Sequence, residues 1–265
     1  MGLEPAIGEA REAGRAVNAV HASRFFGYAT LAWFAATRAS ALRDPQLRLQ
    51  FHRQINANGI AALPLIAALA ALTGATAVTQ VTALAGQDND LAQRLLFFGL
   101  FFELAPLLTA LVVVARSSAA MASELAVMHL YDEFTALRRM GVPAADYLLL
   151  PRILGLALAL PAVTVCFQLV AVGSGWLAVA LLQNQPLPQI AGHFFDLADP
   201  WLPLASLVKS ALMGAAIGII ACHHGSSAAR STQAISTASI HAVGNALVAV
   251  FVVDVTFALA AYFLK

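Results

Sequence analysis

Five long runs of apolar residues separate the polar stretches of this chain. They cover about residues 59–85, 95–115, 153–182, 201–222 and 241–264. A helix needs about 20 apolar residues to cross a hydrocarbon layer about 30 Å thick, so each run is long enough to span a bilayer. Because lipid offers no partner to backbone N–H and C=O groups, such runs cross as helices. The sequence therefore predicts an all-α integral membrane protein with five transmembrane helices.

The composition excludes most soluble classes of protein. Apolar residues make up 60% of the chain and charged residues only 11%, against about 25% charged residues in soluble domains. The formal net charge of +1 gives no reason to expect nucleic acid as a partner. Cys166 and Cys222 both lie inside apolar runs, which favours a role as small hydrophobic residues over a disulfide or a metal site. No metal ligand set is predicted.

The distribution of basic residues predicts the orientation of the spans. One side of the membrane would receive the arginines before the first run, after the second and after the fourth, which are Arg11, Arg15, Arg24, Arg38, Arg43, Arg48, Arg53, Arg116, Arg138, Arg139, Arg152 and Arg230. The other side would receive only Arg94 and Lys265. Because cytoplasmic segments carry the excess of Lys and Arg, we expect a cytoplasmic N-terminus and a C-terminus on the opposite side of the membrane.

The first 55 residues form a basic segment on the cytoplasmic side. Residues 1–24 have no continuous apolar core, so they are not expected to be a cleaved signal. Residues 17–55 mix aromatic residues with arginines, but their apolar runs are too short to span. This pattern favours an amphipathic helix lying in the cytoplasmic interface, with a loosely ordered basic leader as the alternative.

Three ionisable residues lie within the predicted spans: Glu103, Lys209 and Asp254. Each would cost about 2.5 to 3.5 kcal/mol at the bilayer centre unless it is paired or faces water. Glu103 is near the middle of the second span and Lys209 is about two turns into the fourth, which favours an inward-facing pair or a shared polar cavity. A role in a transport pathway and a buried structural ion pair both satisfy this electrostatic requirement.

The connection at residues 117–150 is more polar than the spans but has a helical pattern. Apolar residues recur at helical spacing, namely Leu125, Met128, Leu130, Phe134, Leu137 and Met140. Gly141-Val142-Pro143 then predicts the end of the helix. A charged, amphipathic cytoplasmic helix between spans two and three suits the groove of a partner protein, although a solvated surface helix would have the same composition.

Motifs for catalysis are absent from the sequence. There is no G-x-x-x-x-G-K-[ST] phosphate loop and no H-E-x-x-H zinc pair. Gly173-Ser174-Gly175 lacks the G-x-S-x-G context of a serine hydrolase, and small residues within a span more often allow close helix packing. The chain is therefore not expected to hydrolyse ATP itself. An intramembrane hydrolase is the weaker alternative.

Residues 103–152 also contain a specific succession of residue types. The positions are Glu103, Pro106, Arg116, Glu124, Leu125, Met128, Glu133, Ala136, Leu137, Met140, Gly141, Pro151 and Arg152. In this order the chain resembles the MlaE family, the permease subunits of ABC-type phospholipid transporters that work with MCE-domain proteins. The resemblance runs from about Asn56 to Phe263 and defines a permease domain at residues 56–265. The chain departs from the family pattern at Phe102, Ala105 and residues 115–119.

The resemblance implies a function and a set of site residues. The chain would move phospholipid or a similar lipid between the inner membrane and a periplasmic MCE-domain partner, while ATP and Mg are bound by a cytoplasmic ABC ATPase and no cofactor by this chain. Glu103 and Lys209 would lie on the substrate pathway, and Arg116 and Asp254 would be structural polar residues in the membrane. A coupling helix for the ATPase would include Glu124, Met128, Glu133, Leu137, Arg138, Met140 and Gly141.

The number of spans and the resemblance also indicate partners and alternative functions for this chain. Five spans in one chain leave an asymmetric half-channel, so we expect a homodimer with two coupling helices. A small STAS-domain regulator is a further candidate partner by resemblance. A membrane scaffold that keeps the fold without transport is the main alternative function, and a co-purifying ATPase would separate the two.

Overall fold

The computed structural model describes residues 26–37, 45–85, 98–183 and 201–263. In these ranges the regular structure is helical, with no β-strand. The α-helices beyond residue 45 are α2 (Pro45–Asn58), α3 (Leu63–Ala85), α5 (Ala105–Val113), α6 (Ala119–Leu130), α7 (Glu133–Arg139), α8 (Leu150–Gln183), α10 (Trp201–Ser226) and α11 (Thr232–Phe263). One 3₁₀ turn, η2 (Ile60–Ala62), and three π-helical segments, η3 (Phe98–Leu104), η4 (Val114–Ser118) and η5 (Ala145–Leu149), join some of these helices.

The described residues contain five helical segments that are long and apolar enough to cross a membrane, which confirms the predicted all-α fold with five spans. They are Leu49–Val81, Phe98–Leu130, Ala145–Leu181, Pro203–Ser226 and Thr232–Ala261. The predicted interfacial segment at residues 17–55 lies partly outside the described residues. Its described part forms a helix over residues 26–37 and α2. Because α2 leads through η2 directly into α3, the first apolar helical segment begins at Leu49, earlier than the predicted start at residue 59.

The second spanning helix extends beyond the predicted end at residue 115. The helix continues through α6, whose residues Met121, Ala122, Leu125 and Ala126 are buried. Helix α6 packs against both α10 and α11, so apolar burial offsets the polar residues that suggested a boundary at residue 115. The independent helix of this connection is only α7, which follows a left-handed residue, Asp132, with φ of 58°.

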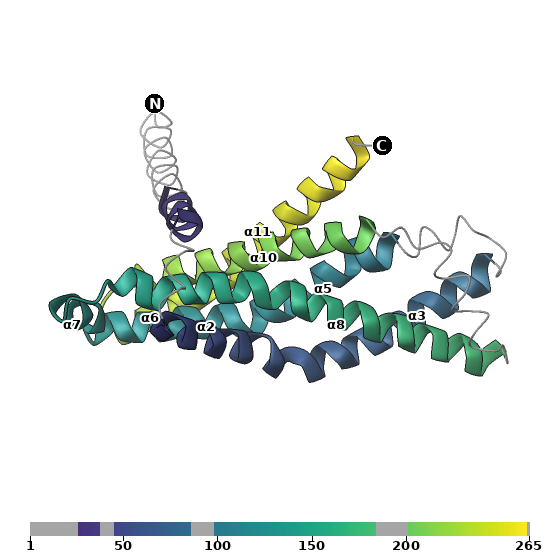
Figure 1. The fold of residues 1–265 in the computed structure, drawn as a ribbon, viewed down its shortest axis with the longest axis horizontal. Coiled ribbons are helices and arrows are strands. Elements are labelled where there is room, and N and C mark those ends of the chain that lie inside the picture. The colour runs from purple at the N-terminus through teal and green to yellow at the C-terminus, as the bar shows by residue number, and fades with distance from the viewer. Residues whose placement is uncertain (1–25, 38–44, 86–97, 184–200, 264–265) are drawn as a thin grey trace, which may run out of the picture.

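Helix α8 is the central element of the bundle, and it runs alongside α3, α10 and α2 (Figure 1). Small residues allow this packing: a Cβ on Gly74 would overlap the carbonyl oxygen of Ala171, and one on Gly214 would overlap that of Leu156. Between the helices lie large buried side chains of α8 and α10, among them Ile153, Leu156, Leu160, Phe167, Met213 and Ile217.

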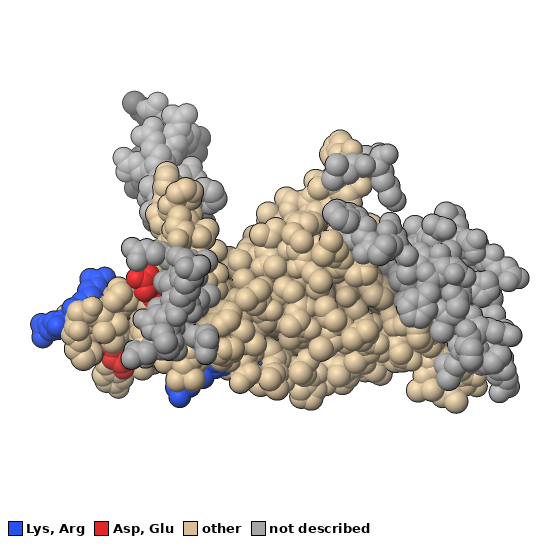
Figure 2. All heavy atoms as spheres, in the orientation of Figure 1, with Lys and Arg blue, Asp and Glu red and all other residues tan. Residues whose placement is uncertain are grey.

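Charged side chains gather at one end of the bundle. In the face that Figure 2 shows, the Lys, Arg, Asp and Glu residues of the described chain lie around α7 and below α2, and the long middle of the bundle carries none on its surface. This is the pattern of a protein whose middle faces hydrocarbon and whose α7 end faces water. Glycine ends α7 as expected, because Gly141 has φ of +77°, a conformation that glycine adopts without strain.

Candidate functional site

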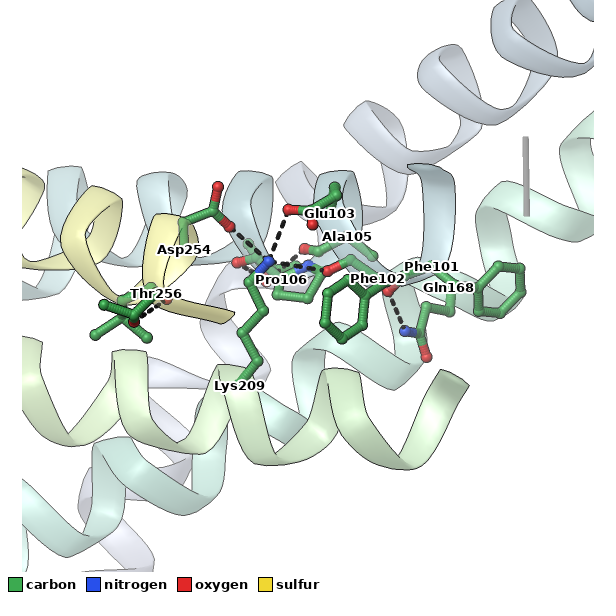
Figure 3. A network of polar contacts seen from close by, with 11 residues as sticks. Phe101, Phe102, Glu103, Ala105, Pro106, Gln168, Lys209, Asp254 and Thr256 are labelled. Atoms are coloured by element: carbon green, nitrogen blue, oxygen red, sulfur yellow. Dashed lines mark hydrogen bonds and ion pairs between the residues drawn. The ribbon is translucent and has the colours of Figure 1, made fainter. Parts of the chain in front are cut away.

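A cluster of three charged side chains lies inside the bundle (Figure 3). The Nζ atom of Lys209, on α10, is 2.7 Å from Glu103 Oε2 in η3 and 2.8 Å from Asp254 Oδ1 on α11. The structure thus brings together the three ionisable residues of the predicted spans, which come from three different helical segments. Asp254 is a direct partner of Lys209, whereas the family resemblance implied only a structural role for it.

The Lys209 ammonium is fully occupied by its neighbours. Its side chain is 0% exposed, and Nζ also donates to the carbonyl oxygen of Phe102 at 3.2 Å. The Phe102 ring adds a cation–π contact, with its centroid 4.7 Å from Nζ. An ammonium has three protons, and three oxygen atoms surround this one. Two of these contacts are hydrogen bonds, to Phe102 and Glu103, and the third is an ion pair with Asp254.

The two carboxylates form the accessible part of the cluster. The side chains of Glu103 and Asp254 are 27% and 16% exposed, and Figure 3 shows both meeting the end of the Lys209 side chain on the side away from α10. With both acids ionised, the cluster carries a net charge of −1. An uncompensated charge is costly in hydrocarbon, so partial exposure of these two side chains reduces the cost of the cluster. The cluster consequently presents an acidic face.

Pro106 explains why backbone oxygen atoms are available to this cluster. Proline has no N–H, so it cannot donate to the carbonyl four or five residues before it. The two carbonyls that lose this donor belong to Phe102 and Phe101, and both accept side-chain hydrogen bonds instead. Lys209 donates to the first and Gln168 Nε2, at 3.1 Å, to the second. The π-helical turn and Pro106 thus leave two backbone carbonyls free to accept side-chain hydrogen bonds within an apolar sequence.

Next to these carbonyls lies a set of buried polar side chains that was not predicted from the sequence. Gln168 Nε2 also donates to Ser206 Oγ at 2.8 Å, which links α8 to α10. On the neighbouring turns the hydroxyls of Thr109 and Thr164 are 3.0 Å apart and join α5 to α8. The available signal was a glutamine in the middle of an apolar run, because a buried amide needs partners on other helices.

The residues predicted for ATPase coupling are divided between two helices. Glu124 and Met128 lie on α6, whereas Glu133, Leu137 and Arg138 lie on α7, and Met140 and Gly141 follow it. Glu124 faces Arg152 of α8, with its Oε2 atom 3.1 Å from Nη2. Arg138 and Met140 are exposed.

Arg116, predicted as a structural polar residue, lies in η4 and donates from Nη1 to the carbonyl oxygen of Ala61. It therefore ties the second spanning helix to η2 and does not take part in the charge cluster. Asp132, immediately before α7, pairs with Arg230 at 2.6 Å, and Arg230 precedes α11.

A second polar network fixes the helix over residues 26–37 to the bundle. The Tyr28 hydroxyl is 2.8 Å from His224 Nε2, and Asn245 Nδ2 is 2.8 Å from the same nitrogen. The rings of His223 and His241 pack nearby, and a Cβ on Gly27 would overlap the His223 ring in its present position. Within the described ranges, no three histidine, cysteine or carboxylate side chains form a group that could hold a metal ion.

Comparison with known proteins identifies the family. The family model "Permease MlaE" matches residues 51–260. Protein TRIGALACTOSYLDIACYLGLYCEROL 1 of Arabidopsis thaliana chloroplasts is 31% identical over 168 residues, which cover 62% of this chain and 46% of that protein. A probable ABC transporter permease of Synechocystis is 29% identical over 57% of each chain, and one of Rickettsia felis is 25% identical over 83% of this chain and 85% of its own. The chain belongs to the MlaE permease family.

Proposed function

We propose that this chain is the membrane-spanning subunit of an ABC transporter that moves phospholipid or a similar lipid between the inner membrane and a periplasmic MCE-domain partner. The observation that carries the proposal is the cluster of Glu103, Lys209 and Asp254, because partly exposed carboxylates inside an apolar bundle suit the polar part of an amphiphile. Support also comes from a relative whose name refers to a galactolipid and from relatives named as ABC transporter permeases.

The energy for transport would come from a separate cytoplasmic ATPase that binds ATP and Mg. Helix α7 is the natural docking element, since it is short, charged and located at the polar end of the bundle. The ion pair between Asp132 and Arg230 joins the start of α7 to the start of α11, and α11 carries Asp254. Movement of α7 would therefore be passed along α11 to the charge cluster, where it would change the space open to lipid.

Two copies of the chain would complete the transporter. A homodimer would provide two coupling helices and cover the partly exposed carboxylates of Glu103 and Asp254. In the proposed orientation the α7 end and the N-terminus face the cytoplasm and the C-terminus faces the periplasm, where the MCE-domain protein would bind. The exposed apolar side chains of α11, among them Val248, Val252 and Val255, suit either lipid or the second copy.

Replacing Glu103 by glutamine is expected to reduce lipid transfer at least about tenfold, equivalent to ~1.4 kcal/mol, while assembly stays normal. Glutamine has almost the same shape but removes the charge that is accessible to lipid. The measurement is transfer of labelled phospholipid from proteoliposomes containing the complete transporter to the MCE-domain partner. Glu103→Asp keeps the charge and should retain more activity. Unchanged transfer by Glu103→Gln would exclude Glu103 from the mechanism.

Reversing the exposed charges of α7 with Arg138→Glu and Arg139→Glu is expected to abolish co-purification of the ATPase. The two side chains lie at the end of α7, where they would contact the partner directly. The tagged protein is purified from native membranes in mild detergent, and its partners and lipids are identified by mass spectrometry. Arg53→Glu, an exposed arginine on α2, is the matched control. If the unmodified chain retains no ATPase, the scaffold interpretation replaces the transporter.

A further inference from the structure

A pocket of about 350 Å³ lies at the α7 end of the bundle. Its walls come from α2, α6, α7, η5 and the start of α8, and none of its lining residues belongs to the Lys209 cluster. The volume is within the range of small-ligand sites, roughly 300–1,000 Å³. The polar residues that matter for its chemistry are Gln50, Gln54, Glu133, Tyr147 and Arg152.

Arg152 is the chemically decisive residue of this pocket. Its side chain is only 7% exposed, and Nη2 donates to Glu124 Oε2 at 3.1 Å. Nη1 is buried and has no hydrogen-bond acceptor among the described residues. Leaving a buried donor of a charged group without an acceptor is costly, by about 1–3 kcal/mol or more. A guanidinium with one open nitrogen favours an anionic acceptor.

Two further donors line the same pocket. Gln50 Nε2 donates to the Tyr147 hydroxyl oxygen at 3.2 Å, which leaves the phenolic hydrogen able to donate elsewhere. Asn58 Nδ2 donates to Gln54 Oε1 at 3.2 Å, which leaves the amide N–H groups of Gln54 as its remaining donors. Together with Arg152, the pocket therefore offers a guanidinium, a hydroxyl and an amide as donors. The Tyr147 hydroxyl oxygen and Gln54 Oε1 each already accept one hydrogen bond.

One carboxylate and an apolar wall complete the pocket. Glu133 lines it from α7, but no ion pair joins Glu133 to Arg152 in the described part of the chain. Met128, Leu137, Leu148 and Pro151 provide apolar surface next to the donors. A ligand here would contact α2, α7 and α8 together, and would hold α7 in place against the bundle.

We propose that this pocket binds a phosphate group. A tetrahedral phosphate has several acceptor oxygens, enough for the Arg152 guanidinium, the Tyr147 hydroxyl and the Gln54 amide at once. The group could belong to a lipid headgroup, whose apolar part would lie on the Leu137 wall, or to free phosphate. Both sources share the same recognition chemistry, and the experiment separates them.

The test measures thermal unfolding of the purified full chain in nonionic detergent. Three probes are compared: inorganic phosphate against chloride at equal ionic strength, mixed micelles with phosphatidic acid, and mixed micelles with diacylglycerol of the same acyl chains. A saturable rise in Tm of about 5 °C or more is expected with a phosphate-bearing probe well above its Kd. A rise with phosphatidic acid alone supports a lipid source, and a rise with inorganic phosphate as well supports free phosphate. No rise, or an equal rise with diacylglycerol, overturns the proposal.

Substitutions test whether the rise in Tm comes from binding in this pocket. Arg152→Gln should remove the rise, but it also breaks the pair with Glu124 and could impair folding. Ala136→Trp leaves Arg152 intact and fills the pocket from α7, so it should also remove the rise, whereas Thr135→Trp on the neighbouring position should keep it. Glu133→Gln removes a repulsive charge and should lower Kd roughly twofold to fivefold. A rise that survives Ala136→Trp, or weaker binding by Glu133→Gln, contradicts the assignment.

Discussion

Replacing Lys209 by methionine is expected to lower the free energy of unfolding by about 3–5 kcal/mol, the cost typical of breaking a buried ion pair by removing one partner. Methionine has a similar length, so the change removes the charge with little loss of volume. Glu103 and Asp254 would then face each other without the ammonium that lies 2.7 and 2.8 Å from them. The measurement is the unfolding midpoint in detergent together with the yield of folded protein from membranes.

The control removes the two acids as well. Lys209→Met combined with Glu103→Gln and Asp254→Asn leaves no uncompensated charge, so it should recover most of the lost stability while lipid transfer remains impaired. If Lys209→Met alone is as stable as the unmodified chain, the cluster does not hold η3, α10 and α11 together. A triple variant less stable than the single one would show that hydrogen bonding, not charge balance, is the main contribution.

Hydropathy was sufficient to predict the number of spans, because each helix must supply its own length of apolar surface to the bilayer. The ends of the helices were less predictable. The second span continues through Arg116 because that side chain finds the carbonyl of Ala61, and through α6 because α10 and α11 cover its apolar residues. Neither partner is adjacent in sequence, so a local polarity count placed the boundary too early.

The charge cluster was partly predictable for a similar reason. The cost of ions in hydrocarbon indicated that Glu103 and Lys209 need partners, and the structure brings them together. A side-chain hydrogen bond to the carbonyl of Phe102 could have been predicted from Pro106, because proline leaves a carbonyl without its helical donor in the preceding turn. The ion pair between Asp254 and Lys209 was not predictable, since it depends on which face of α11 packs toward α10.

The pocket beside Arg152 could not be predicted from local patterns. It exists because α2 packs on α8, where Gly155 leaves room for Gln54, and because α7 turns back after Asp132. Its donors come from two distant parts of the chain: Gln50, on α2, is 97 positions from Tyr147, its hydrogen-bond partner in η5. Sequence spacing gives no information about such an approach, because it depends on how the helices cross.

Adding one methyl group at the crossing of α3 and α8 is expected to have the second large effect. Gly74→Ala should lower the free energy of unfolding by about 2–3 kcal/mol, because the new Cβ would overlap the backbone carbonyl of Ala171 and a backbone cannot move aside as a side chain can. Gly173→Ala is the matched control on α8, where nothing lies within 4 Å of the added Cβ. That change should be neutral or stabilising, since alanine favours a helix by up to about 1 kcal/mol over glycine. Unfolding midpoints of both variants in the same detergent provide the comparison. Equal midpoints would mean that α3 can move away from α8 at little cost in free energy. The close packing of the two helices would then contribute little to stability.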